Sequence, residues 1–110
     1  MKSTVRITFT FFLLALLSLA AKAGKVDTIA IYSNSMHKNI NTVVIKPDTY
    51  KKKKNNFPVV YLLHGYDGWY SNWILRVPEL TSYADQYQVI IVCPDGAKSS
   101  WYFDSPVDTA

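Results

Sequence analysis

Cysteine, histidine and glycine are scarce in this chain of 110 residues, which contains one cysteine, two histidines and four glycines. A single cysteine excludes an intrachain disulfide framework, and Cys93, inside an apolar run, is expected to be a small buried hydrophobic residue. His37 and His64 have no helical or hairpin spacing with carboxylates that would gather three ligands, so neither a metal nor another cofactor is expected. With 49% apolar and 15% aromatic residues, the composition is that of a globular protein.

Excess charge of one sign is also small outside the N-terminal segment. The formal charge is +4, from 12 basic and 8 acidic residues, but Lys2, Arg6 and Lys22 lie within the first 23 residues. The rest of the chain is nearly balanced, which gives no electrostatic basis for binding nucleic acid or an anionic membrane. The basic run Lys51 to Lys54 lies between two predicted strands, where such a run is typically a solvated loop.

The first 23 residues have the pattern of a signal peptide. Lys2 and Arg6 precede an apolar run over residues 7–20, and the small-x-small sequence Ala21-Lys22-Ala23 follows it. The apolar run is shorter than the ~20 residues that a permanent transmembrane helix needs. We therefore expect cleavage near Ala23 and no stable membrane anchor. The product is expected to be secreted or periplasmic, with its domain beginning at residue 24.

Apolar patterning predicts four strands and one helix in residues 24–110. Two apolar runs, 58–63 and 89–93, each end abruptly at turn residues. Both runs are hydrophobic on both faces, which is typical of parallel strands in an α/β protein. Helical spacing of apolar side chains after Pro78 predicts the helix between them, and together they form a βαβ unit. We expect strands at 26–32, 41–46, 58–63 and 89–93, a helix at 78–88, and an exposed loop at 47–56.

Two loops follow the carboxyl ends of the predicted parallel strands, where ligands of open α/β sheets bind. These loops, 64–73 and 94–104, contain all three tryptophans of the chain. Aromatic side chains gathered at this edge favour a pocket wall for an aromatic or sugar-like ligand over simple capping of the core. The candidate pocket residues are His64, Trp69, Trp73, Trp101, Tyr102 and Asp104.

Three sequence blocks carry a resemblance to a known family. They are PVVYLLHGYDGWYSNW at 58–73, VIIVCPDG at 89–96 and SWYFDSP at 100–106. In this order and spacing, the chain from about Ile40 onward resembles the esterase D-like branch of the α/β hydrolases. That branch includes feruloyl and acetylxylan esterases, S-formylglutathione hydrolases and mycolyltransferases. The resemblance implies an α/β fold, as the N-terminal part of an α/β-hydrolase sheet with two leading strands before the parallel βαβ unit.

The resemblance also implies that the first block supplies half of an oxyanion hole. Ester hydrolysis places negative charge on the former carbonyl oxygen, and a fixed backbone N–H aimed at it can lower the barrier by about 3 kcal/mol. By resemblance the donor is the N–H of Tyr66, or less favourably that of Asp67, with Gly65 permitting the tight turn. His64 resembles a residue that orients this loop, and Asp67 stands where family members often have glycine.

The catalytic triad of that family is not found in these 110 residues. No serine lies in a Gly-x-Ser-x-Gly sequence and no histidine follows His64. The resemblance places the nucleophile, acid and base beyond Ala110. We therefore expect residues 24–110 to be the N-terminal portion of an exported carboxylic ester hydrolase, truncated before the nucleophile elbow and inactive alone, whose substrate is a small-molecule or carbohydrate ester. The alternative is a small exported carbohydrate-binding module that stacks Trp and Tyr side chains on sugars without catalysis.

Overall fold

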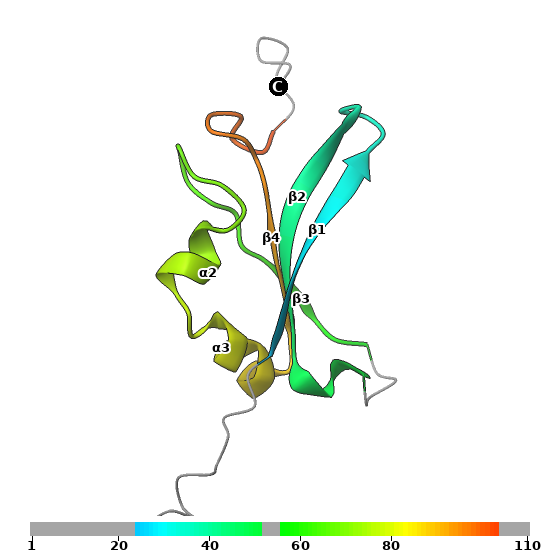
Figure 1. Ribbon diagram of the computed structural model, residues 1–110, viewed down its shortest axis with the longest axis vertical. Coiled ribbons are helices and arrows are strands. Elements are labelled where there is room, and N and C mark those ends of the chain that lie inside the picture. Colours follow the sequence, from blue (N-terminus) through cyan, green and yellow to red (C-terminus); the bar gives the residue numbers. More distant parts are fainter. Residues whose placement is uncertain (1–23, 52–55, 104–110) are drawn as a thin grey trace, which may run out of the picture.

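A computed structural model of the protein describes residues 24–51 and 56–103. The expectations for the signal peptide and for Asp104 fall outside the described residues. Four strands form one mixed sheet in the order β1-β2-β4-β3 (Figure 1). The strands are β1 (Lys25–Ser33), β2 (Lys38–Lys46), β3 (Val59–Tyr61) and β4 (Ile90–Pro94), and the helical segments are η1 (Asp48–Lys51), α2 (Asn72–Arg76) and α3 (Leu80–Tyr87).

The sheet combines an antiparallel hairpin with a parallel pair. β1 pairs antiparallel with β2, and β2 pairs antiparallel with β4. β3 lies parallel to β4, with α3 between them in sequence, so the predicted βαβ unit and the two leading strands are confirmed. The hairpin register places Lys25 opposite Lys46, and Asp27 forms ion pairs with both lysines. Hydrogen bonds from Lys46 and then Lys25 hold the pKa of the Asp27 carboxyl below its ordinary value.

The hydrophobic core lies where β2 and β4 pack against α3. Alternate residues of β2 share one face of the sheet, and the register pairs Val43 with Cys93 and Ile45 with Ile91. α3 covers this face with Leu80 and Ala84, which are four residues apart and therefore on one side of the helix. The buried hydrophobic residues are Val43, Ile45, Leu80, Ala84, Ile91 and Cys93.

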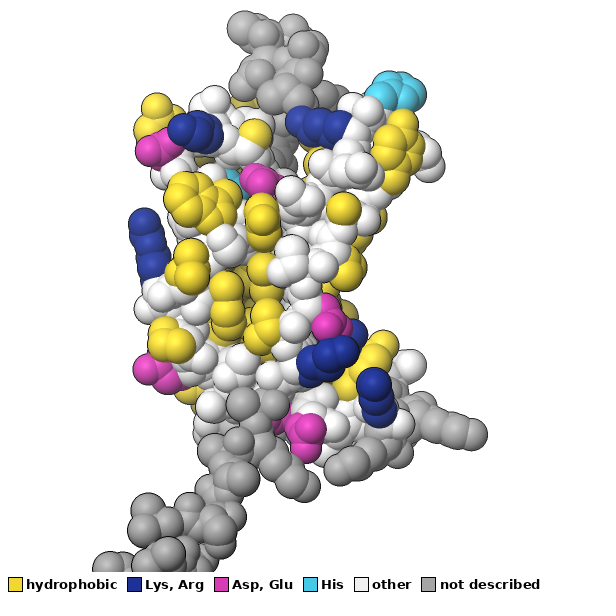
Figure 2. Space-filling model, in the orientation of Figure 1, with side chains coloured by type: hydrophobic (Ala, Val, Ile, Leu, Met, Phe, Trp, Pro, Cys, Tyr) yellow, Lys and Arg dark blue, Asp and Glu magenta, His cyan; other side chains and the backbone are white. Residues whose placement is uncertain are grey.

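β3 differs from the prediction in length and cover. The predicted strand 58–63 shortens to three residues, although the N–H of Leu62 still donates to the carbonyl of Val92 at 2.9 Å. β3 is an edge strand of the described sheet, and all three of its side chains are exposed. Its outer row of backbone N–H and C=O groups therefore has no strand partner among the described residues. Figure 2 shows hydrophobic side chains exposed across the middle of one face of the molecule.

Two helical segments were not predicted. η1 lies within the predicted loop 47–56, and α2 begins at the end of the predicted loop 64–73. Both helices are too short for apolar periodicity to be visible. Within residues 24–51 and 56–103, no helix has the length and apolar character needed to cross a membrane.

Candidate functional site

The two aromatic loops meet at one edge of the sheet because β3 and β4 are parallel. Residues 62–71 follow β3, and residues 95–103 follow β4. A backbone hydrogen bond joins the loops directly, from the N–H of Asp67 to the carbonyl of Lys98 at 2.9 Å. The predicted site at the carboxyl ends of these strands is therefore formed by two loops that are hydrogen-bonded to each other.

His64 connects the two loops through both of its ring nitrogens. Its side chain is 2% exposed, with Nδ1 2.9 Å from the carbonyl oxygen of Gly65 and Nε2 3.0 Å from the backbone nitrogen of Gly96. Because a carbonyl only accepts and a backbone N–H only donates, Nδ1 carries the proton and Nε2 accepts. The imidazole is therefore neutral in this arrangement. Its basic lone pair is already engaged, which leaves it poorly placed to take a proton from a substrate.

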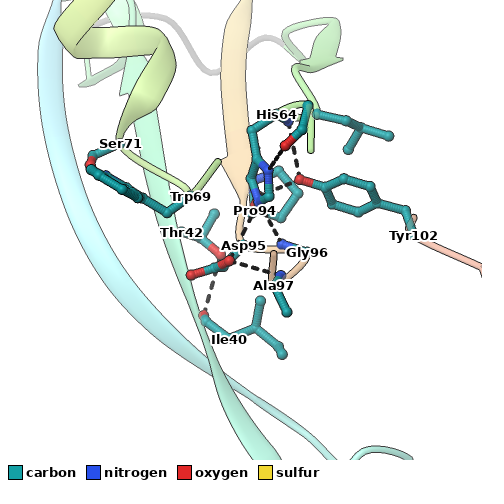
Figure 3. A network of polar contacts seen from close by, with 12 residues as sticks. Ile40, Thr42, His64, Trp69, Ser71, Pro94, Asp95, Gly96, Ala97 and Tyr102 are labelled. Atoms are coloured by element: carbon teal, nitrogen blue, oxygen red, sulfur yellow. Dashed lines mark hydrogen bonds and ion pairs between the residues drawn. The ribbon is translucent and has the colours of Figure 1, made fainter. Parts of the chain in front are cut away.

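Tyr102 closes the same network (Figure 3). Its hydroxyl accepts the backbone N–H of His64 at 3.1 Å and donates to the carbonyl of Pro94 at 3.3 Å. Burial raises the pKa of Tyr102, so the hydroxyl keeps the proton that it donates. The tyrosine ring lies against Gly96, where an added Cβ would stand only 2.3 Å from it. Gly96 therefore provides the space that allows the ring to reach His64.

A tight turn over residues 65–68 presents a free backbone donor. The N–H of Gly68 donates to the carbonyl of Gly65 at 3.0 Å. Asp67 has φ 57°, whereas Tyr66 does not have a positive φ, which is the pattern of a type II turn. The N–H of Asp67 is bound to Lys98, but within the described part of the chain the N–H of Tyr66 has no acceptor. The turn thus leaves the Tyr66 N–H available to a ligand.

Replacing Asp67 with glycine is expected to stabilise the protein. Glycine adopts positive φ without the steric cost that a Cβ imposes, and the net gain after the entropy of glycine is on the order of 0.5 kcal/mol. The lost ion pair with Lys98 is highly exposed and contributes little. Urea unfolding followed by circular dichroism measures the effect. Asp67→Ala removes the same charge but keeps a Cβ, so equal stability of the alanine and glycine variants would contradict this explanation.

The aromatic candidates divide into two groups. Trp73 is partly buried against the core, and its indole N–H donates to the carbonyl of Leu63 at 3.1 Å. The indole N–H of Trp69 donates to the Ser71 hydroxyl (Figure 3). Trp101 and Tyr66 are exposed, and their rings stack with centroids 6.3 Å apart. The structure therefore places Trp73 in a supporting position and the Tyr66–Trp101 pair at the surface, one ring from each loop.

An open pocket lies beside the turn. His64, Gly65, Asn72, Trp73 and Arg76 line it. Of the predicted pocket residues it contains His64 and Trp73, whereas Trp69, Trp101 and Tyr102 are not among its lining. Asn72 and Arg76 are not among the residues predicted from the sequence, because no helix is predicted at 72–76, although their four-residue spacing after the 65–68 turn is visible. No cluster of three potential metal ligands occurs in the described ranges.

Comparisons with known proteins identify relatives of this architecture. The family model described as putative esterase matches residues 33–110. An acetyl esterase of Caldicellulosiruptor saccharolyticus is 34% identical over 85 residues, which cover 69% of this chain and 30% of the relative. A solved ferulic acid esterase is similar with a TM-score of 0.66 and 26% identity, over 76% of this chain and 37% of that one.

Two further structures share the fold. An S-formylglutathione hydrolase of Staphylococcus aureus has a TM-score of 0.60 at 17% identity, over 76% of this chain and 34% of that one. A ferulic acid esterase of Anaeromyces mucronatus has a TM-score of 0.60 at 23% identity, over 74% of this chain and 32% of that one. The chain thus spans about a third of the length of its relatives. Since the family model covers more than half of it and the sheet has the matching partial α/β-hydrolase fold, the chain belongs to the putative esterase family.

Proposed function

We propose that this chain supplies one oxyanion-hole donor and part of the substrate pocket of an exported carboxylic ester hydrolase. The observation that carries the proposal is the Tyr66 N–H, which lies in a tight turn at the carboxyl end of β3 and has no acceptor among the described residues. A backbone N–H in such a turn is fixed before the reaction, so it can stabilise the developing oxyanion without reorganisation.

The surrounding contacts support this role for Tyr66 over Asp67. The N–H of Asp67 donates to Lys98 and is therefore occupied. His64 and Tyr102 hold the start of the turn from both sides, through the Gly65 carbonyl and the His64 N–H. These bonds restrict the position of the Tyr66 N–H, and position decides whether such a donor acts in the transition state.

Nucleophilic attack on the ester requires residues that these 110 do not provide in a recognisable motif. No Gly-x-Ser-x-Gly sequence is present, and His64 uses both ring nitrogens in loop contacts. In the proposed mechanism a serine, an acid and a histidine from elsewhere form the triad, while Tyr66 contributes one of the two oxyanion donors. The signal-peptide pattern of residues 1–23 supports export of the product to the periplasm or the exterior.

The proposed substrates are esters of small acids, with a carbohydrate as the proposed alcohol. The acid part is supported by the similar proteins, which include an acetyl esterase and a ferulic acid esterase. Carbohydrate binding without catalysis is a second candidate, favoured by the exposed stacked pair of Tyr66 and Trp101. Paired exposed aromatic rings are suited to sugar rings as well as to an aromatic acyl group.

A chimera separates the two candidates. Residues 33–110 replace the matching segment of the Caldicellulosiruptor acetyl esterase, and hydrolysis of p-nitrophenyl acetate is measured. We expect activity well above that of the same chimera with the nucleophilic serine changed to alanine, and none for the 110-residue chain alone. A chimera with native-like circular dichroism but no activity would contradict the proposed hydrolytic role and favour the binding module.

A further inference from the structure

The pocket beside the 65–68 turn has a polar wall that the proposed function does not use. From its chemistry we infer that Asn72 and Arg76 form a subsite for a carboxylate, so that the ester bound by this protein carries an acidic sugar, a uronic acid. This inference rests on the proposed function, because it names the substrate class of the same site. It depends on three sets of observations: the position of the two side chains, the charges around them, and the shape of their neighbours.

α2 brings the two polar residues to one pocket. Asn72 and Arg76 are the first and last residues of this helix, four positions apart, so they lie on the same side of it. Both line the pocket together with His64, Gly65 and Trp73. Asn72 also lies under the turn, since a Cβ added to Gly68 would be 2.7 Å from its Nδ2. The proposed subsite is thus directly beside the proposed oxyanion donor.

The charges near the pocket leave Arg76 without an anionic partner. Asp67 pairs with Lys98 at 3.4 Å, and Asp95 lies 3.4 Å from Nε2 of His64. Among the residues that the structure describes, no carboxylate is within ion-pair distance of Arg76, and the Asn72 amide has no hydrogen-bond partner. With His64 neutral through its two loop contacts, the guanidinium is the single formal charge among the lining residues.

The donor set matches a carboxylate attached to a ring. A guanidinium presents parallel N–H groups that bind a carboxylate through two hydrogen bonds, and the Asn72 amide can add a third. Trp73 already donates its indole N–H to Leu63, so what it offers the pocket is apolar ring surface. Aromatic surface beside charged donors suits a sugar that carries an acid group better than a bare inorganic anion.

The pocket is partly open to solvent. Its empty space of about 260 Å³ includes solvent at its mouth, so a ligand would lie against its wall and stay partly exposed. A single sugar ring, with its carboxylate on Asn72 and Arg76, is a suitable occupant of such a site. The remainder of the ester would extend past the turn toward the exposed pair of Tyr66 and Trp101, which lies on the same two loops.

Tryptophan fluorescence of the full 110-residue chain tests the inference, because Trp73 lines the pocket. We expect saturable quenching by D-galacturonate and none by D-galactose, which has the same ring without the carboxylate. Arg76→Gln should weaken galacturonate binding at least about tenfold, as expected for losing a hydrogen-bonded charge pair. Arg76→Lys keeps the charge but not the paired donors, so its affinity for galacturonate should lie between that of the unsubstituted chain and that of Arg76→Gln. Lys51→Gln, a matched loss of one exposed cation in η1 that does not line the pocket, should leave binding unchanged.

Four results would overturn the subsite: no saturable binding of galacturonate, equal binding of galactose, unchanged binding by Arg76→Gln with native circular dichroism, or inorganic phosphate binding as tightly with the same dependence on Arg76. The last would assign the pocket to phosphate. Failure here is distinguishable from failure of the proposed function, because the latter is measured as hydrolysis of p-nitrophenyl acetate, which has no carboxylate, by the unsubstituted chimera.

Discussion

Replacing Tyr66 with proline is expected to lower the kcat of the acetyl esterase chimera by ~10²–10³-fold, the range measured when one oxyanion donor is removed. Proline has no N–H, so the substitution deletes the proposed donor itself. Its ring fits the second position of a type II turn, where Tyr66 lies before Asp67 with φ 57°. The turn should therefore keep its shape while losing the donor. Steady-state kinetics with p-nitrophenyl acetate measure the effect.

The matched control is Tyr66→Ala, which removes the aromatic ring and retains the N–H. This variant should keep most of its kcat, and both variants should melt close to the parent chimera. If alanine and proline lowered kcat equally, the ring and not the backbone donor would be responsible. If proline left kcat unchanged, the donor would have to be another amide of the turn.

Replacing Ile45 with alanine is expected to cost about 2–5 kcal/mol of the free energy of unfolding, the range for removing a large aliphatic side chain from a core. Ile45 is 0% exposed and lies opposite Ile91 in the centre of the cluster under α3. Small domains have total stabilities of about 5–15 kcal/mol, and the buried hydrophobic core of the described residues consists of six side chains. The loss is thus a large part of the total, and urea unfolding of the full chain should show a much lower midpoint.

Ile29→Ala provides the control on the neighbouring strand. Ile29 is in β1, is 43% exposed and has Thr42 as its partner in the hairpin register. The same chemical change there should alter stability by no more than about 0.5 kcal/mol, as for most surface substitutions. Equal midpoints for the two variants would show that the core is not centred on β2, β4 and α3.

The strands and the main helix could be predicted because the spacing of apolar residues along the sequence indicates which of their side chains are buried. Residues 89–93 are apolar on both faces, and β4 is one of the two interior strands of the described sheet, with β2 on one side and β3 on the other. For the same reason the helix at 78–88 was identified, although only Leu80 and Ala84 of its apolar side chains are buried. Pairing direction followed from the βαβ pattern, since a helical crossover between consecutive strands makes them parallel.

The details of the site could not be predicted in the same way, because they depend on contacts between loops. Nothing local to Arg76 signals that α2 will turn it toward the glycine-rich loop. The left-handed backbone of Trp101 and Tyr102 likewise has no signature in the sequence, whereas Asp67 is of a residue type that adopts positive φ more readily. The tautomer of His64 is decided by Gly65 and Gly96, and the second of these is 32 positions away.

The sheet order also constrains how the chain assembles. β4 lies between β2 and β3, so the hairpin of the first two strands shares no ladder with β3. Until Ile90–Pro94 has emerged from the ribosome, no strand links the β1–β2 hairpin to β3. The pairing of β4 with β2 and with β3 must therefore close loops of roughly 30 to 50 residues. Non-local pairing of this kind slows folding, and the apolar strands stay unpaired for longer. In nascent chains of this protein, the hairpin and β3 would remain unlinked until β4 is synthesised.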